Sequence, residues 1–199
     1  MHSPTLILLA SIFSVLVTLV LYAVWYFNRH IPGLRLWVFS LLSTSVFCGN
    51  LLVRGPVPEV VSVVLAQVAI ALTGYLCWLG SRAYVGRAPI PSGYAALALV
   101  GLVGASVYFT DVQPNPGARF VMAGLFSGVF FLLTAHTLAR GGFHRVPMRY
   151  LFAGLLCAHG IFVLVRPLVF KLLAPQGNSS LSSSLSSIVV LESTVILVL

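Results

Sequence analysis

The sequence predicts an all-α membrane protein, a polytopic bundle of seven transmembrane helices that fills residues 1–199 as one domain. Hydrophobic residues make up 59% of the chain and charged residues 7%, and the mean hydropathy of +1.06 is far above that of soluble domains. Long apolar runs alternate with short loops, and prolines fall between the runs. The net charge is +8, and most of the basic residues lie in these loops, which favours a role in membrane orientation over nucleic-acid binding.

Each expected helix corresponds to one apolar run. The seven runs cover residues 6–27, 36–53, 60–79, 94–109, 120–139, 150–173 and 188–199. Most are close to the roughly 20 residues that cross a bilayer as a helix. Pro167 is the proline inside a run, and we expect it to kink the sixth helix near Val163, either widening a pocket or merely accommodating packing.

The loop charges predict the orientation of the bundle. The odd-numbered connections carry Arg29, Arg35, Arg82, Arg87, Arg140, Arg145 and Arg149. The second and fourth carry Arg54 and Arg119 together with Glu59 and Asp111. Because cytoplasmic loops are enriched in arginine and lysine, the odd connections are predicted to be cytoplasmic and the N-terminus outside.

The last run is too short to cross a bilayer. From residue 188 to residue 199 a helix rises only about 18 Å, against roughly 30 Å of hydrocarbon. We therefore expect the last helix to be truncated here and the natural protein to continue past Leu199 into a cytoplasmic output domain.

Two ionisable residues in the middle of the sixth run, His159 and Arg166, are seven positions apart and so lie on one side of a helix. Each costs a few kcal/mol in hydrocarbon unless it is paired or reaches water, so this side should face protein or a wet cavity. Glu192 in the last run is the expected counter-charge, at a similar height to Arg166.

Three further polar residues are assigned to the same site: Asn50, Gln67 and Lys171. Asn50 and Gln67 share the predicted layer of Arg166, and Lys171 lies near the outer interface. One hypothesis is a pocket in the outer half of the bundle, where Arg166 holds a carboxylate or phosphate and apolar helices surround a tail. The alternative is a network that only locks helices together, with the two amides as interhelical hydrogen bonds.

No catalytic residues, cofactor or metal site are predicted. His136 and His159 lie at different depths, and no carboxylate or thiolate joins them. Three pairs of small residues four positions apart predict close helix packing or dimerisation: Gly101 with Ala105, Gly124 with Gly128, and Gly154 with Ala158.

The segment Asn28-Arg-His-Ile-Pro-Gly-Leu-Arg-Leu-Trp37 resembles a basic Ile-Pro-Gly-Leu-type turn found after the first helix in membrane sensor regions of bacterial GGDEF-class diguanylate cyclases and some histidine kinases. The resemblance implies a sensor in the bacterial inner membrane that signals through its last helix to a cyclase module producing cyclic-di-GMP. It also implies a homodimer formed through that module. No GGDEF sequence lies within these residues.

From the residues we therefore expect a receptor for a small amphipathic or anionic ligand, embedded in the lipid bilayer. A small-solute transporter that uses the same polar layer is the first alternative, although no inverted repeat is discernible. A membrane assembly or scaffold subunit is the second.

Overall fold

The computed structural model of the chain describes residues 3–53, 58–88, 92–141 and 147–173, and all regular elements within them are helical. In order they are α1 (Ser3–Phe27), α2 (Leu34–Leu52), α3 (Glu59–Tyr84), α4 (Ser92–Val107), the π-helix η1 (Tyr108–Val112), α5 (Pro116–Arg140) and α6 (Pro147–Leu173). The all-α class is thereby confirmed. The seventh apolar run lies outside the described residues, so the seven-helix count stays a prediction.

Five of the helices are long and apolar enough to cross a membrane. The segments that meet this criterion are Ile7–Phe27, Leu34–Leu52, Glu59–Tyr84, Gly117–Arg140 and Met148–Pro167. The fourth apolar segment, Ala96–Val112, is shorter. Among the predicted spans that the structure describes, the fourth is therefore the one that is shorter than a full bilayer crossing.

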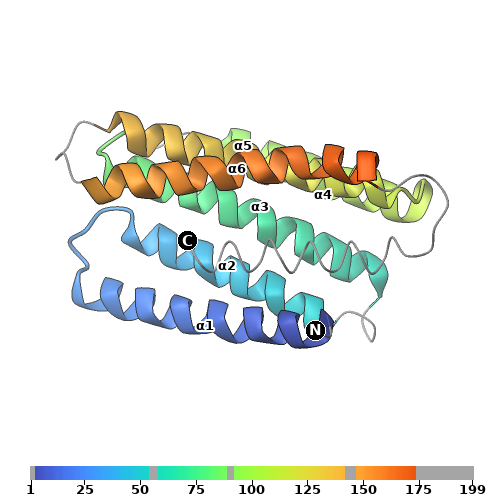
Figure 1. Cartoon of the computed structure of the whole chain (residues 1–199), viewed down its shortest axis with the longest axis horizontal. Coiled ribbons are helices and arrows are strands. Elements are labelled where there is room, and N and C mark those ends of the chain that lie inside the picture. The colour runs from blue at the N-terminus through green and yellow to red at the C-terminus, as the bar shows by residue number, and fades with distance from the viewer. Residues whose placement is uncertain (1–2, 54–57, 89–91, 142–146, 174–199) are drawn as a thin grey trace.

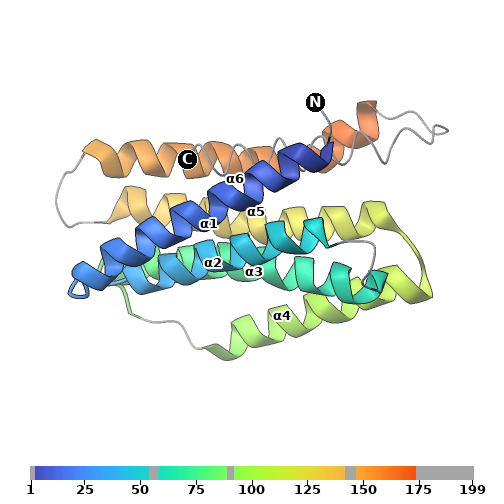
Figure 2. The same ribbon diagram turned by 90° about the horizontal axis from the view of Figure 1, so that it is seen from below.

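Successive helices run in opposite directions, as Figure 1 shows. α1 packs against α2, and α6 packs against α5. α3 contacts α2, α4 and α5, and Figure 2 shows α4 on one side of the bundle beside it. α3 is therefore the central helix of the described bundle.

Local sequence explains where the helices begin. α2 follows Gly33, whose φ of +86° is a left-handed conformation that glycine adopts without strain. α5 follows Asn115, whose side chain accepts a hydrogen bond from the backbone N–H of Ala118 at 3.0 Å, and Pro116 occupies the first helical position. α3 begins directly after Pro58.

The two ends of the bundle differ in charge. At one end Gly33 lies directly against the carbonyl of Gly80, and Gly141 packs on Val85, so the connections after α1, α3 and α5 lie together. Of the arginines predicted for this end, the structure describes Arg29, Arg35, Arg82, Arg87, Arg140 and Arg149. We call it the basic end. The opposite end carries Glu59, Asp111 and Arg119, and which end faces the cytoplasm remains a prediction.

Candidate functional site

The polar side of α6 faces α5. His159 is 3% exposed, and its ring meets the ring of Phe131 edge-on with centroids 4.8 Å apart. Arg166 is 6% exposed, and its guanidinium carbon lies 3.9 Å from the centroid of Phe120. The seven-residue spacing thus places both side chains on one buried side of the helix, against aromatic rings of α5.

The ring nitrogens of His159 are buried, and the described residues do not meet their hydrogen-bonding capacity. Neither Nδ1 nor Nε2 has a hydrogen-bond partner within the described residues. A buried polar group without a partner costs about 1–3 kcal/mol, which is why such groups in native proteins are few and often functional. This imidazole is available to a hydroxyl, carboxyl or water that enters the α5–α6 interface.

Arg166 lies where α5 and α6 approach closely. Gly124 faces the carbonyl oxygen of Val163, and a Cβ at position 124 would lie 3.0 Å from that oxygen and 3.6 Å from Cγ of Pro167. Pro167 has no N–H for the Val163 carbonyl, so this oxygen lacks its usual helical donor. Because position 124 is a glycine, α5 can pack directly against this carbonyl, about one helical turn from Arg166.

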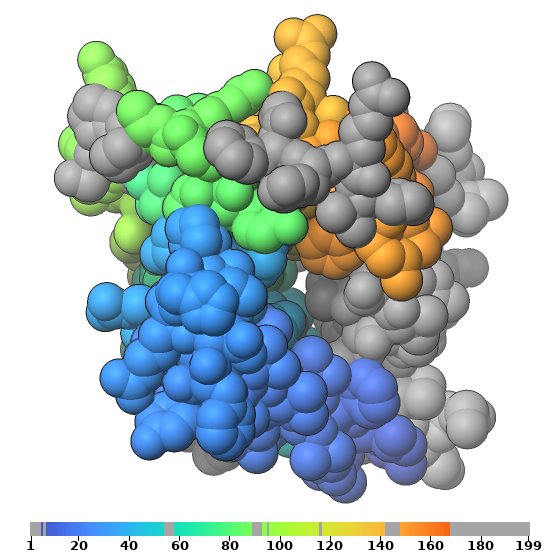
Figure 3. Space-filling view, turned by 90° about the vertical axis from the view of Figure 1, so that its left-hand side faces the viewer, coloured from blue at the N-terminus to red at the C-terminus, as the bar shows by residue number. Residues whose placement is uncertain are grey.

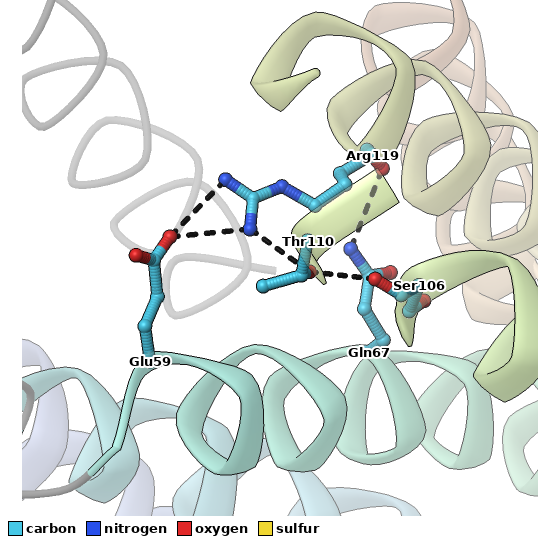
Figure 4. Close-up of polar contacts among 5 residues, drawn as sticks. All are labelled: Glu59, Gln67, Ser106, Thr110 and Arg119. Carbon is cyan, nitrogen blue, oxygen red and sulfur yellow. Dashed lines mark hydrogen bonds and ion pairs between the residues drawn. The ribbon is translucent and has the colours of Figure 1, made fainter. Parts of the chain in front are cut away.

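A second polar cluster lies at the end of the bundle opposite the basic end (Figure 4). Arg119 donates from Nη1 to Oε1 of Glu59 at 3.2 Å and to Oγ1 of Thr110 at 3.0 Å. Thr110 donates to the carbonyl of Ser106 at 2.6 Å, and Gln67 donates to the carbonyl of Arg119 at 3.4 Å. The cluster joins α3, the π-helix and the start of α5.

Sequence reasoning assigned Glu59 and Arg119 only to membrane orientation and did not consider Thr110. Two features of the sequence could have indicated this cluster, namely the charges of Glu59 and Arg119 and their positions along the chain. Glu59 opens α3 and Arg119 lies in the first turn of α5, so opposite charges stand at the starts of two helices that begin at the same end of the bundle. Pairing at that end was predictable, whereas the contribution of the π-helix was not.

The predicted site residues divide into two groups. Gln67 and Arg166 lie in one layer on two sides of the start of α5, because Gln67 bonds the Arg119 carbonyl while Arg166 stacks on the next residue, Phe120. Oε1 of Gln67 is buried and has no hydrogen-bond partner among the described atoms. We call Gln67, Arg119, Phe120 and Arg166 the distal polar layer, because it lies toward the end opposite the basic end. His159 lies deeper, at the level of Phe131.

Of the other predicted site residues, the structure describes the side-chain contacts of Asn50 alone. Asn50 is 5% exposed and donates to the carbonyl of Ser62 at 2.9 Å, a bond that links α2 to α3. Lys171 lies in α6, near the end of the helix. Glu192 lies outside the described residues, so its pairing with Arg166 stays a prediction.

The described part of the chain brings no three His, Cys, Asp or Glu side chains together in a way that could hold a metal ion. Five of the described helices are long and apolar enough to cross a membrane, and one of them carries a buried arginine and a buried histidine. The class is therefore a helical membrane protein with ionisable groups inside a span. No protein-family model, curated protein or solved structure matches the chain.

The segment that resembles GGDEF-associated sensors has a packing role in this fold. Gly33 allows the chain to turn against the carbonyl of Gly80. Trp37 donates from Nε1 to the carbonyl of Cys77 at 3.2 Å and to Oγ of Ser81 at 3.3 Å. These contacts fix the start of α2 on α3, and they explain the glycine and the tryptophan without reference to any family.

Proposed function

We propose that this chain is a membrane receptor domain that binds a small anionic, amphipathic molecule at the α5–α6 interface, in the outer half of the bundle. The observation that carries the proposal is the pair of buried ionisable side chains on one side of α6, His159 and Arg166. Burial of such groups in a span is costly, and they are retained mainly where they bind or conduct something.

The chemistry of the two residues favours an anionic headgroup. A guanidinium binds carboxylate or phosphate through two parallel N–H···O bonds, and stacking on Phe120 fixes the plane of the Arg166 guanidinium. His159 supplies a donor and an acceptor deeper in the interface, for a hydroxyl or carbonyl of the same molecule. Apolar side chains of α5 and α6 then surround the tail.

Signalling follows from the position of α6. A ligand that favours one arrangement of α5 and α6 shifts the equilibrium toward it by its difference in affinity. The predicted seventh helix, running inward with the N-terminus outside, passes the displacement to a cytoplasmic output domain. By the resemblance noted above, that domain is a diguanylate cyclase that acts as a homodimer at the bacterial inner membrane.

The test compares molecules that copurify with the native chain and with the variant Arg166→Gln, identified by mass spectrometry of solvent extracts. We expect an anionic amphipathic molecule in the native extract and at least a tenfold loss from the variant, since a charged hydrogen bond is worth about 1.5–3 kcal/mol. His136→Gln, which alters an exposed histidine of α5, is the control and should retain the molecule.

The competing hypothesis is a purely structural network. It requires identical extracts from the native chain and Arg166→Gln, with only the melting temperature lowered. That result would overturn the receptor proposal.

A further inference from the structure

The basic end of the bundle carries positive charge that the described chain does not neutralise. Arg29, Arg35, Arg87 and Arg140 are all exposed there. The chain has three acidic residues, and the two in the described part, Glu59 and Asp111, lie at the opposite end. Among the described residues the one ion pair, Arg119 with Glu59, is also at the opposite end.

Aromatic rings lie beside two of these arginines, Arg29 and Arg35. The Arg29 guanidinium carbon is 4.8 Å from the ring centroid of Tyr26 and 5.9 Å from that of Trp25. Arg35 lies 5.6 Å from the centroid of Phe39. A guanidinium held over a ring at the end of a membrane span stays at headgroup depth, with N–H groups at its edge free to face phosphate oxygens. Figure 3 views this end, where the turn from α1 to α2 and the ends of α3 and α5 come together.

We infer that the basic end is a binding surface for the phosphate groups of anionic phospholipids. Exposed cations beside aromatic rings, with the described carboxylates at the other end of the bundle, complement a negatively charged membrane surface. Arginine or lysine near such a surface contributes about 1 kcal/mol of attraction. The inference is independent of the ligand proposed for Arg166, which lies toward the opposite end of α6.

The chain carries its own probe for this surface. Its three tryptophans are Trp25, Trp37 and Trp78. Trp25 lies beside Arg29, and the Trp78 ring centroid lies 5.4 Å from the guanidinium carbon of Arg82. Trp37 packs on Tyr84 with ring centroids 5.5 Å apart. All three tryptophans therefore report on the basic end. Lipids with brominated chains quench tryptophan fluorescence on contact.

The experiment reconstitutes the full chain in bilayers of phosphatidylglycerol and phosphatidylcholine at equal fractions, with bromine on one lipid at a time. We expect brominated phosphatidylglycerol to quench more strongly, and the difference to disappear in the triple variant Arg29→Gln, Arg35→Gln, Arg87→Gln. Loss of three charges should weaken relative binding on the order of a hundredfold. Thermal unfolding in pure phosphatidylcholine checks that the triple variant is folded.

Two further arms separate charge from other causes. The matched triple variant with lysine at the same positions should keep most of the preference, and Asp111→Asn, which removes an exposed charge at the opposite end, should keep all of it. Equal quenching by both lipids in the native chain, or a preference that survives the glutamine triple variant, would overturn the inference.

Discussion

At the scale of single residues, two buried polar side chains differ in whether their polar atoms have hydrogen-bond partners. Asn50 makes an interhelical hydrogen bond, whereas the ring nitrogens of His159 make none within the described residues. The first therefore contributes to the stability of the bundle, and the second costs free energy unless something binds it. Both were predicted as site residues, and both stay predictions as such; among the described residues Asn50 has a hydrogen-bond partner and the His159 ring nitrogens have none.

Replacing each residue with leucine should move stability in opposite directions. His159→Leu is expected to raise the free energy of unfolding by about 1–2 kcal/mol, because it removes two unsatisfied nitrogens. Asn50→Leu is expected to lower it by about 1 kcal/mol through loss of the bond to Ser62. Thermal unfolding in detergent, with bound molecules extracted first, measures both. A fall in stability for His159→Leu as large as that for Asn50→Leu would show that the imidazole has a structural partner.

At the scale of helices, glycine decides which surfaces can meet. A Cβ on Gly160 would lie 3.1 Å from the carbonyl oxygen of Gly128 and from Cγ of Leu132, and one on Gly128 would lie 2.6 Å from Cγ of Leu164. The predicted packing role of Gly124 with Gly128 is therefore confirmed for α5 against α6. Cβ atoms on Gly101 and Gly154 would meet no described atom within 4 Å, so packing or dimerisation at these two pairs stays a prediction.

Substitution with valine separates these two kinds of glycine on one helix. Gly160→Val should destabilise the protein by about 1–3 kcal/mol, because the backbone and side chains of α5 must move away. Gly154→Val, six residues earlier on an exposed surface of α6, is the control and should change stability by less than about 0.5 kcal/mol. Equal melting temperatures for the two variants would contradict the α5–α6 packing.

At the scale of the whole molecule, antiparallel helices bring alternate connections to the same end of the bundle. The arginine-rich connections therefore lie together at one end. The prediction that the basic end is cytoplasmic can be tested with cysteines at two exposed positions, His30 in the first connection and Gln113 after the π-helix. In intact bacterial cells, a membrane-impermeant maleimide should label Gln113→Cys, and it should label His30→Cys only after permeabilisation.

The native chain, whose cysteines are buried or half-buried, gives the background for that labelling. The reverse labelling pattern would show that the bundle has the opposite orientation in the membrane. It would also place the distal polar layer on the cytoplasmic side, and the proposed receptor would then sense a molecule from inside the cell.

By itself, the sequence determined the helical class, the approximate helix positions and the separation of charge between the two ends. These depend on local properties, namely run length, proline positions and the alternation of loops. Helix ends were less accurate where polar and aromatic residues continue a helix past its apolar part. The run at 60–79, for example, belongs to a helix that extends over Glu59–Tyr84.

Only the tertiary structure decided which polar residues meet. Gln67 reaches the carbonyl of a residue 52 positions away, and Glu59 pairs with an arginine 60 positions away. The rotation of each helix about its axis sets such contacts, and hydrophobicity constrains rotation weakly when lipid and protein interior are equally apolar. Close contacts at Gly124, Gly128 and Gly160 set that rotation for α5 and α6, and they place Arg166 on Phe120 and His159 on Phe131.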